Sequence, residues 1–181
     1  MVKRRFPVHL IYPLVTSLDP HWHNSMKLVA GIFLTLAYRM ALVYWRIARP
    51  STYGAFVAVW HEGRILAIKN SYKAQWSFPG GGVKSSETAI QAATRELREE
   101  VGIVVESSSL SLVDEFICHS EFKKDHATAF EITFDIEPTV QVDGLEVIEA
   151  KFIDFDEFLA RRHEFTEPAN CYLDWKSPKL S

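Results

Sequence analysis

The pattern of apolar and polar residues changes near residue 50, and the two sides of that point predict different structures. In residues 26–49, apolar side chains recur at helical spacing with few polar interruptions, which predicts one helix of about six turns. Pro50 would end this helix, because proline disfavours a helical conformation in the residue before it. From residue 53 onward, short apolar and β-branched runs alternate with turn residues, which is typical of strands.

The runs after residue 53 predict strands on both sides of one embedded helix. YGAFVAVW and RILAIKN are separated by HEG, a hairpin signal, and WSFPGGG is a short strand that breaks into a glycine loop. Three further strand-like runs follow the helix: LSLVDEFICH, ATAFEITFDI and EVIEAKFIDF. We therefore expect an α/β sandwich in which helices cover a mixed sheet.

The embedded helix has clear limits in the sequence. Residues 88–101 contain neither proline nor glycine, Ser85 and Ser86 are N-cap candidates before them, and Gly102 is a stop after them. One apolar stripe of this helix would face the core. Three carboxylates fall beside that stripe, in the last two turns: Glu96, Glu99 and Glu100.

The placement of these three acids requires a counter-charge. The C-terminal end of a helix repels carboxylates, and water screens their mutual repulsion least beside a buried face. A hard divalent cation would supply the charge through oxygen ligands: Mg²⁺ suits a site that also binds phosphate, and Mn²⁺ fits too. The alternative is a solvated acidic face on which Arg95 and Arg98 pair with the glutamates.

The end of the chain predicts one more helix and then little order. DFDEFLARRH reads as a helix with Asp154 or Asp156 as its N-cap. The C-terminal tail, residues 166–181, is expected to be weakly ordered after Pro168, because it ends in the polar run KSPKLS.

The composition is that of a foldable globular domain with an extension, and its charge is unevenly spread. Residues 1–50 carry seven basic residues against the single acid Asp19, so the remainder must carry −9 to give the net charge of −3. An acidic body argues against a general nucleic-acid binder, whose affinity depends on a basic surface. Cys118 and Cys171 lack metal-ligand spacing, so neither a disulfide scaffold nor a zinc site is expected.

The extension, residues 1–50, leaves several interpretations open. Its helix, about residues 26–49, is long and apolar enough for a membrane span, but Arg39 near its middle would be costly there. Most of its basic and small residues share one stripe, which favours an amphipathic helix packed on protein, for example across a dimer interface. A membrane-surface helix and a true span are the alternatives. Residues 1–25 read as a loosely attached leader, or as an over-extended start with Met26 as the native first residue.

One stretch matches a family signature at every defined position. Gly81 is followed after five residues by Glu87 and, seven residues later, by RELREEVGI at residues 95–103. This pattern is similar to the Nudix box, so the chain resembles the Nudix hydrolases over about residues 51–165. The resemblance implies an α/β/α sandwich with a mixed sheet, to which residues 1–50 add an N-terminal helical extension.

The resemblance also implies a reaction and the residues that carry it. Nudix enzymes hydrolyse a nucleoside diphosphate linked to another moiety, and water attacks a phosphorus with Mg²⁺ or Mn²⁺ as the cofactor. The implied metal ligands are Glu96, Glu99, Glu100 and the backbone carbonyl of Gly80. Glu99 and Glu100 would carry catalysis, Arg95 would orient the glutamates by charge-assisted hydrogen bonds, and Glu87 would support the loop.

The general base has several candidates. It would be a box glutamate or a later acid, Glu146 or Glu149, with Asp143 as a weaker option. The alternative for each later acid is a solvated carboxylate at a strand end.

Candidates for substrate contact come from three parts of the chain. They are Trp76, Phe78, Gly81, Gly82 and Arg39. The two aromatic residues could stack on a base, although strand residues of this kind more often pack in the core. Lys123 and Lys124 could contact phosphate, but they are expected in a solvated turn.

The predicted function is metal-dependent pyrophosphate hydrolysis, with ADP-ribose or another nucleoside diphosphate sugar favoured as substrate. The alternatives are a nucleoside triphosphate pyrophosphohydrolase, an RNA 5′-end pyrophosphohydrolase, which the acidic body does not favour, and, from another class, a nucleotide-sensing Nudix module without catalysis. We expect a cytoplasmic homodimer that binds a small nucleotide, with nucleic acid not favoured and membrane association through the helix less favoured.

Overall fold

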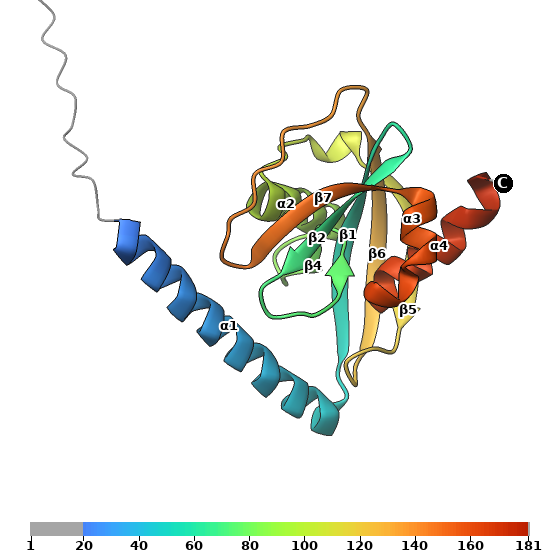
Figure 1. Ribbon diagram of the computed structural model, residues 1–181. Helices are drawn as coiled ribbons and strands as arrows, with labels where there is room; N and C mark the ends of the chain where they lie inside the picture. The colour runs from blue at the N-terminus through green and yellow to red at the C-terminus, as the bar shows by residue number, and fades with distance from the viewer. Residues whose placement is uncertain (1–19, 181) are drawn as a thin grey trace, which may run out of the picture.

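The structure is a computed structural model of the 181-residue chain that describes residues 20–180, with side chains described for residues 28–177 (Figure 1). The predictions that concern residues 1–19 lie outside this described range. Within it, a seven-stranded mixed sheet lies between helices, and a long helix extends away from the body. This arrangement confirms the predicted mixed α/β sandwich with an N-terminal helical extension.

The sheet is built around its two longest strands. Its strands are β1 (Ser51–His61), β2 (Arg64–Asn70), β3 (Trp76–Ser77), β4 (Gly80–Gly82), β5 (Ser111–Cys118), β6 (Lys124–Thr133) and β7 (Val147–Asp154). The order is β3-β2-β1-β6-β5, with β4 also pairing β1 and β7 also pairing β2. β1 and β6 run parallel, and the other pairs are antiparallel. The predicted hairpin joins β1 to β2, and Glu62 and Gly63 have the positive φ angles that a two-residue hairpin turn requires.

The sheet is covered on both faces, so the middle of β1 is buried without alternation. On one face, Ala55, Val57 and Val59 pack with the apolar stripe of α2 (Ala89–Val101). On the other face, Phe56 and Trp60 pack with α3 (Phe155–Ala160) and α4 (Glu167–Leu180). A strand buried on both faces reads as a continuous apolar run, which is how β1 appears in the sequence.

α2 begins slightly later than the sequence suggested. Thr88 is its N-cap and forms a capping box with Gln91, so Ser85 and Ser86 are not caps. Gly102 ends the helix in the left-handed conformation with a φ of 69°, and its N–H donates to the carbonyl of Leu97. Both ends of the helix are therefore fixed by local hydrogen bonds.

The prediction of a weakly ordered tail at residues 166–181 is wrong over most of its length, because α4 occupies residues 167–180. Pro168 lies in the first turn of α4, where its missing N–H removes no helical hydrogen bond. Tyr172 and Leu173 are fully buried against the sheet. The hydroxyl of Tyr172 accepts from the indole of Trp60 and donates to the carboxylate of Glu131. α3 begins after Asp154, one of its two N-cap candidates.

Among the described side chains, α1 (Pro20–Ala48) contacts the body through its C-terminal half (Figure 1). Its Tyr38 donates to Glu121 at 2.6 Å, and Trp45 lies under the ammonium of Lys123 at 4.5 Å. Leu34 and Leu42 are half-buried, but nine large apolar side chains of α1 are exposed, so the expected packing on protein is not provided for them by this chain's own body. Residues 28–48 are long and apolar enough to cross a membrane, by length and composition only.

Truncating Leu173 to alanine tests whether α4 belongs to the folded core. We expect Leu173→Ala to lower the free energy of unfolding by about 2–5 kcal/mol, because it empties a fully buried site. Asp174→Ala is the control: this neighbour makes an exposed ion pair with Arg162 and should cost about 1 kcal/mol or less. Urea unfolding measures the free energy of unfolding of both variants. Equal small decreases would show that α4 does not contribute to the folded core.

Candidate active site

The site is built where α2 meets the glycine strand β4. The N–H of Gly80 donates to Glu100 Oε2 at 2.8 Å, which ties the end of α2 to the strand. A Cβ on Gly81 would lie 2.4 Å from Glu96 Oε1, and a Cβ on Gly80 would lie 2.4 Å from the carbonyl oxygen of Ala55. The position of Gly80 therefore requires glycine, because its Cβ would meet fixed backbone, whereas a Cβ on Gly81 would displace the carboxylate of Glu96.

Arg95 donates hydrogen bonds to three of the acidic residues. Its Nε and Nη2 donate to the two carboxylate oxygens of Glu87 at 3.0 and 2.7 Å, a bidentate pair. Its Nη1 donates to Glu96 at 2.6 Å and to Glu99 at 3.1 Å. Its Nη2 also donates to the carbonyl of Gly82 at 3.2 Å. One guanidinium thus connects three carboxylates and β4, which places Arg95 where the sequence predicted an orienting role.

The electrostatics divide the acids into two kinds. Burial raises the pKa of Glu100 well above its ordinary value, and the charges of Glu96, Glu146 and Asp143 add to the rise. Burial also raises the pKa of Glu96, although the hydrogen bond from Arg95 opposes the effect. The hydrogen bond from Arg95 lowers the pKa of Glu87 to about 2. Glu100 therefore lacks a positive partner and Glu96 is compensated only in part by Arg95, whereas Glu87 is fully compensated.

A divalent cation would supply that charge, and the donors suit one. The carboxylates of Glu96, Glu99 and Glu100 and the carbonyl of Gly80 are hard oxygen ligands of the kind that Mg²⁺ and Mn²⁺ prefer. Over the described residues, no three His, Cys, Asp or Glu side chains are already gathered as a ligand set. Glu96 and Glu99 instead share Arg95. The chemistry of these oxygen donors fits a metal ion. In this structure the guanidinium of Arg95, rather than an ion, binds the carboxylates of Glu96 and Glu99.

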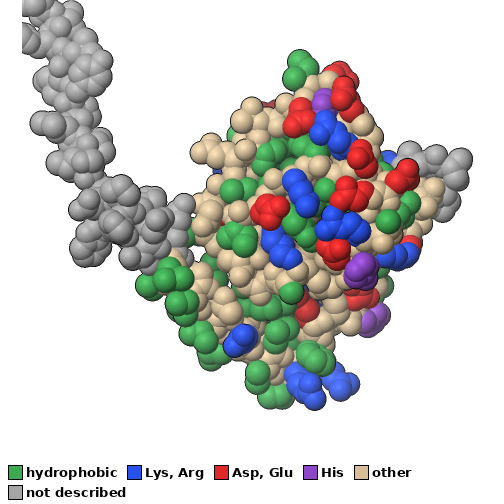
Figure 2. All heavy atoms as spheres, viewed as in Figure 1, with side chains coloured by type: hydrophobic (Ala, Val, Ile, Leu, Met, Phe, Trp, Pro, Cys, Tyr) green, Lys and Arg blue, Asp and Glu red, His purple; other side chains and the backbone are tan. Residues whose placement is uncertain are grey.

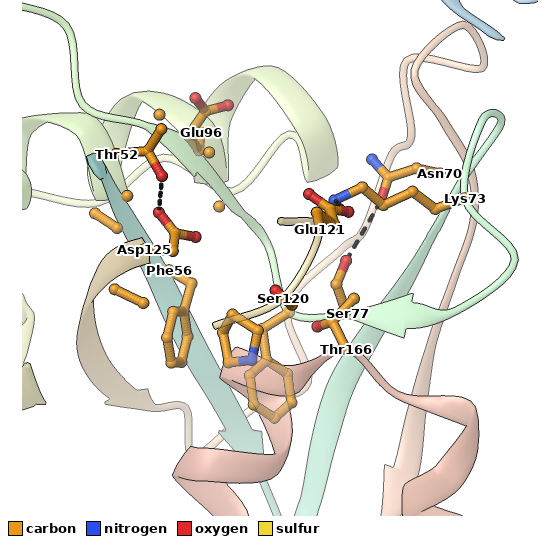
Figure 3. A pocket seen from close by; sticks show the side chains of 18 of the residues that line it. Thr52, Phe56, Asn70, Lys73, Ser77, Glu96, Ser120, Glu121, Asp125 and Thr166 are labelled. Atoms are coloured by element: carbon orange, nitrogen blue, oxygen red, sulfur yellow. Dashed lines mark hydrogen bonds and ion pairs between the residues drawn. The ribbon is translucent and has the colours of Figure 1, made fainter. Parts of the chain in front are cut away.

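A cavity of about 800 Å³ adjoins these acids. Glu96, Glu99 and Arg95 of α2 line one end of it, together with Gly80, Gly81 and Gly82 of β4. Figure 3 shows Glu96 on one side of this cavity and the pair of Lys73 and Glu121 on the other, with Thr52 and Asp125 hydrogen-bonded between the strands. The volume lies within the range of about 300–1,000 Å³ that is usual for small-ligand sites.

The far wall of the cavity comes from segments that the sequence did not single out. Tyr38 and Trp45 of α1 line it, as do Tyr72 and Lys73 from the loop after β2. The rings of Tyr38 and Tyr72 lie 5.1 Å apart, and Lys73 forms an ion pair with Glu121 at 3.0 Å. Lys123, expected in a solvated turn, also lines this wall. No local pattern marked these residues, because contacts such as Tyr38 to Glu121 join positions 83 apart in sequence.

The later acids separate in space. Glu146 lines the cavity and accepts a hydrogen bond from the hydroxyl of Tyr72 at 2.6 Å. Glu149 is exposed on β7, pairs with Lys69 of β2 in the sheet register and is not part of the cavity lining. Asp143 accepts hydrogen bonds from the backbone N–H groups of residues 145, 146 and 147, so it shapes the turn before β7.

The predicted substrate-contact residues also separate. Gly81 and Gly82 line the cavity. Phe78 is 3% exposed and packs in the core, although its edge borders the cavity. Trp76 is buried in the same core away from the cavity lining, and Arg39 is exposed on α1 outside it. The structure therefore does not bring Trp76 or Arg39 to the site, because β3 turns the indole inward and α1 turns the guanidinium outward.

Comparison with known proteins identifies what this arrangement resembles. A family model described as "NUDIX domain" matches residues 50–175. An RNA pyrophosphohydrolase of Halorhodospira halophila is 48% identical over 42 residues, which are 23% of this chain and 23% of that protein. An ADP-ribose pyrophosphatase of Methanocaldococcus jannaschii is 26% identical over 119 residues, 64% of this chain and 69% of that protein. The chain spans between 23% and 32% of the length of the first RNA pyrophosphohydrolases that it matches.

Solved structures share the fold. A bifunctional NMN adenylyltransferase/ADP-ribose pyrophosphatase of Francisella tularensis, complexed with AMP and a manganese ion, superposes with a TM-score of 0.62 at 17% identity. The match covers 86% of this chain and 49% of that one. An Ap4A hydrolase of C. elegans gives a TM-score of 0.59 at 19% identity, over 71% of this chain and 97% of that one.

Replacing Glu100 with glutamine tests the electrostatics without any ligand. Because the pKa of Glu100 is raised in the folded state, its ionised form costs stability above the unfolded pKa of about 4.3. Glu100→Gln should therefore raise the melting temperature in chelator at mildly alkaline pH, and the difference should fade as the pH falls to about 4. Differential scanning fluorimetry measures the melting temperatures at both pH values. Glu106→Gln, at an exposed position, is the control. A lower melting temperature for Glu100→Gln at alkaline pH would contradict this view of the site.

Proposed function

The chain belongs to the Nudix family, and from that membership we propose that it hydrolyses the pyrophosphate bond of a nucleoside diphosphate linked to another moiety, using a divalent metal ion. The observation that carries this proposal is the acidic face of α2. Glu96 and Glu99 line one end of a cavity of about 800 Å³ beside β4, and Glu100 is buried and accepts from the N–H of Gly80, which also lines the cavity. Such a cavity admits a nucleotide, and such donors suit an ion that neutralises phosphates.

The chain's own groups divide the work at the acidic end. Glu96, Glu99, Glu100 and the carbonyl of Gly80 would hold Mg²⁺ or Mn²⁺. When bound, such an ion offsets the charge of the phosphates and lowers the pKa of a coordinated water. Arg95 holds Glu96 and Glu99 beside the strand, so it is a positioning residue.

Glu146 is the better general base of the two later acids, because it lines the cavity and Glu149 does not. The hydroxyl of Tyr72 donates to its Oε1 at 2.6 Å, which fixes the carboxylate and leaves Oε2 to accept a proton from the attacking water. A base held in this way faces the same space as the acids of α2.

The far wall would bind the rest of the substrate. Lys73 and Lys123 line the cavity in ion pairs with Glu121, and phosphate oxygens of a substrate would compete with that carboxylate for their ammonium groups. Tyr38, Tyr72 and Trp45 present aromatic surface on which a base or ribose can lie. A wall of this kind recognises a nucleotide by its phosphates and its ring together.

ADP-ribose or another nucleoside diphosphate sugar is the substrate class that we favour. The support is the ADP-ribose pyrophosphatase of M. jannaschii, whose match spans 64% of this chain, whereas the RNA pyrophosphohydrolase of H. halophila matches 42 residues. The acidic body also disfavours RNA. Nucleoside triphosphates are the alternative within the same chemistry.

A nucleotide panel tests the proposal directly. ADP-ribose, UDP- and GDP-sugars, dNTPs and triphosphorylated RNA are incubated with Mg²⁺, Mn²⁺ or EDTA, and the release of phosphate or monophosphate is measured. We expect chelator-sensitive cleavage of nucleoside diphosphate sugars. Glu99→Gln and Glu100→Gln should each lower kcat/KM on the order of a thousandfold, which corresponds to a loss of several kcal/mol of transition-state stabilisation.

The control for these variants is Glu106→Gln, which removes an exposed carboxylate outside the cavity and should leave turnover unchanged. Near-wild-type turnover of both Glu99→Gln and Glu100→Gln would exclude these residues from catalysis. Nucleotide binding without turnover of any substrate would favour the sensing module instead.

Lys73 provides a test of the far wall. Lys73→Met should raise KM about tenfold with little change in kcat, because it removes uniform binding of a phosphate rather than stabilisation of the transition state. Lys151→Met is the matched control, since Lys151 also lies over an aromatic ring, Trp76, but outside the cavity. Steady-state kinetics separate the two outcomes, and an unchanged KM for Lys73→Met would remove Lys73 from the binding site.

A further inference from the structure

α1 carries a wide apolar surface that this chain does not cover. Nine of its large apolar side chains are between 54% and 80% exposed: Leu28, Val29, Ile32, Phe33, Leu36, Met40, Val43, Tyr44 and Ile47. Figure 2 shows hydrophobic side chains gathered along the helix at the lower left edge of the molecule. At roughly 100 Å² each, they expose on the order of 1,000 Å², more than the 300–600 Å² of the largest patch on a typical monomer.

Six of these residues follow a heptad pattern. They are Val29, Phe33, Leu36, Met40, Val43 and Ile47, spaced by four and three residues in alternation. In heptad terms, Phe33, Met40 and Ile47 occupy a positions, and Val29, Leu36 and Val43 occupy d positions. We call these six residues the seam. Apolar a and d positions over about three heptads are typical of a helix that pairs with another helix.

The seam points away from the body of its own chain. Tyr38 and Trp45, which hold α1 on the body, are seven residues apart and occupy f positions. At 100° per residue, Tyr38 lies about 180° from the centre of the seam. The body therefore cannot cover the seam unless the contact of Tyr38 with Glu121 is broken.

We propose that a second copy of this chain covers the seam, and that the two α1 helices form a parallel two-stranded coiled coil. The six seam residues, with Ile32 at a g position and Tyr44 at an e position, expose roughly 800 Å² per chain at about 100 Å² each, which matches the ~800 Å² that each partner contributes to a stable interface. Because each body is attached at the f positions, the two bodies lie on opposite sides of the helix pair and do not compete for space.

The residues beside the seam favour the parallel orientation. In a parallel pair, the g position of one helix faces the e position of the other five residues further on. Arg39 at g then lies beside Tyr44 of the second copy at e, which suits a cation–π contact. In an antiparallel pair, g positions face each other, and Arg39 would meet a like charge.

A lipid surface is the other occupant that such a helix suggests, and two observations favour the second copy over it. The seam keeps the alternating spacing of four and three residues from Val29 to Ile47, which a lipid surface does not require. The chain after residue 50 carries −9, so repulsion of the body by anionic lipids would offset the attraction of residues 1–50, which carry +6.

The test uses the full chain in detergent-free buffer, with light scattering after size exclusion to give the molar mass. We expect a dimer for the wild-type chain. The double variant Leu36→Glu/Met40→Glu places charges at one d and one a position, and it should be monomeric. Its far-UV circular dichroism should stay near that of the wild type, because both side chains are exposed in the single chain and the body does not depend on them.

The matched control removes a similar amount of apolar surface outside the seam. Leu28→Glu/Tyr44→Glu changes one c and one e position, and it should remain dimeric, since the carboxylate introduced at the e position would face Arg39 of the second copy as an ion pair. Equal loss of the dimer in both double variants would show that heptad position is irrelevant, which overturns the coiled coil.

Two further measurements complete the test. Val43→Cys, at a d position, should cross-link to its counterpart under a mild oxidant, whereas Ala41→Cys at a b position should not, and the reverse result would overturn the parallel register. Flotation with vesicles of phosphatidylcholine and phosphatidylglycerol examines the lipid alternative. A wild-type chain that is monomeric in solution and floats with these vesicles would replace the second copy by a membrane. Neither readout depends on hydrolysis, so the coiled coil and the proposed function fail independently.

Discussion

The close approach of α2 to the glycine strand β4 is the constraint on which the candidate site depends. Gly80 leaves no room for a Cβ, which would meet the carbonyl oxygen of Ala55, and a Cβ on Gly81 would displace the carboxylate of Glu96. That approach lets the N–H of Gly80 reach Glu100, which is buried at the end of the helix. The fold of the body fixes the distance: β4 pairs with β1, and the apolar stripe of α2 packs on the same strand through Ala93 and Leu97. Carboxylates are thereby held where burial and their mutual repulsion make them costly, and such strain is typical of sites that bind a cation.

Arg95 explains how the chain tolerates this arrangement before any ion is bound. The C-terminal half of a helix disfavours carboxylates, and Glu96, Glu99 and Glu100 all lie there. The guanidinium reaches two of them and is itself anchored by the bidentate pair with Glu87. Glu100 has no such contact with Arg95, and its carboxylate is met by a backbone N–H instead. The three glutamates are thus unequal: two are compensated in part by an arginine that an ion could replace, and the third keeps a raised pKa.

The sequence allowed the mixed sheet, the hairpin and the limits of α2 to be predicted closely, because each depends on short-range patterns. Glu62 and Gly63 mark the hairpin turn, and Gly102 marks the end of α2. The acids of the candidate site were found for the same reason, since spacing along one helix places them together. α4 and the far wall of the cavity were missed because their contacts are distant in sequence: Tyr172 joins Trp60 and Glu131, and Tyr38 joins Glu121. Trp76 was a candidate for substrate contact because it is an aromatic residue beside a glycine loop, but β3 directs its side chain into the core, the alternative that the sequence also offered.

One side of α1 lines the cavity and its opposite side is exposed on the surface of the molecule. One side gives Tyr38 and Trp45 to the far wall, and the residues that receive them lie in the turn between β5 and β6, where Glu121 and Phe122 both adopt positive φ angles. Non-glycine residues hold such angles only when surrounding contacts compensate the cost, and here Tyr38 bonds Glu121 while Arg46 lies over Phe122 at 5.2 Å. The turn and the helix therefore stabilise each other. Whatever covers the opposite side of α1 adds order to the helix, and through Tyr38 and Trp45 that order extends to the part of the cavity that would hold the nucleotide. The extension is in this way part of the site's architecture, although it lies outside residues 50–175 that the family model matches.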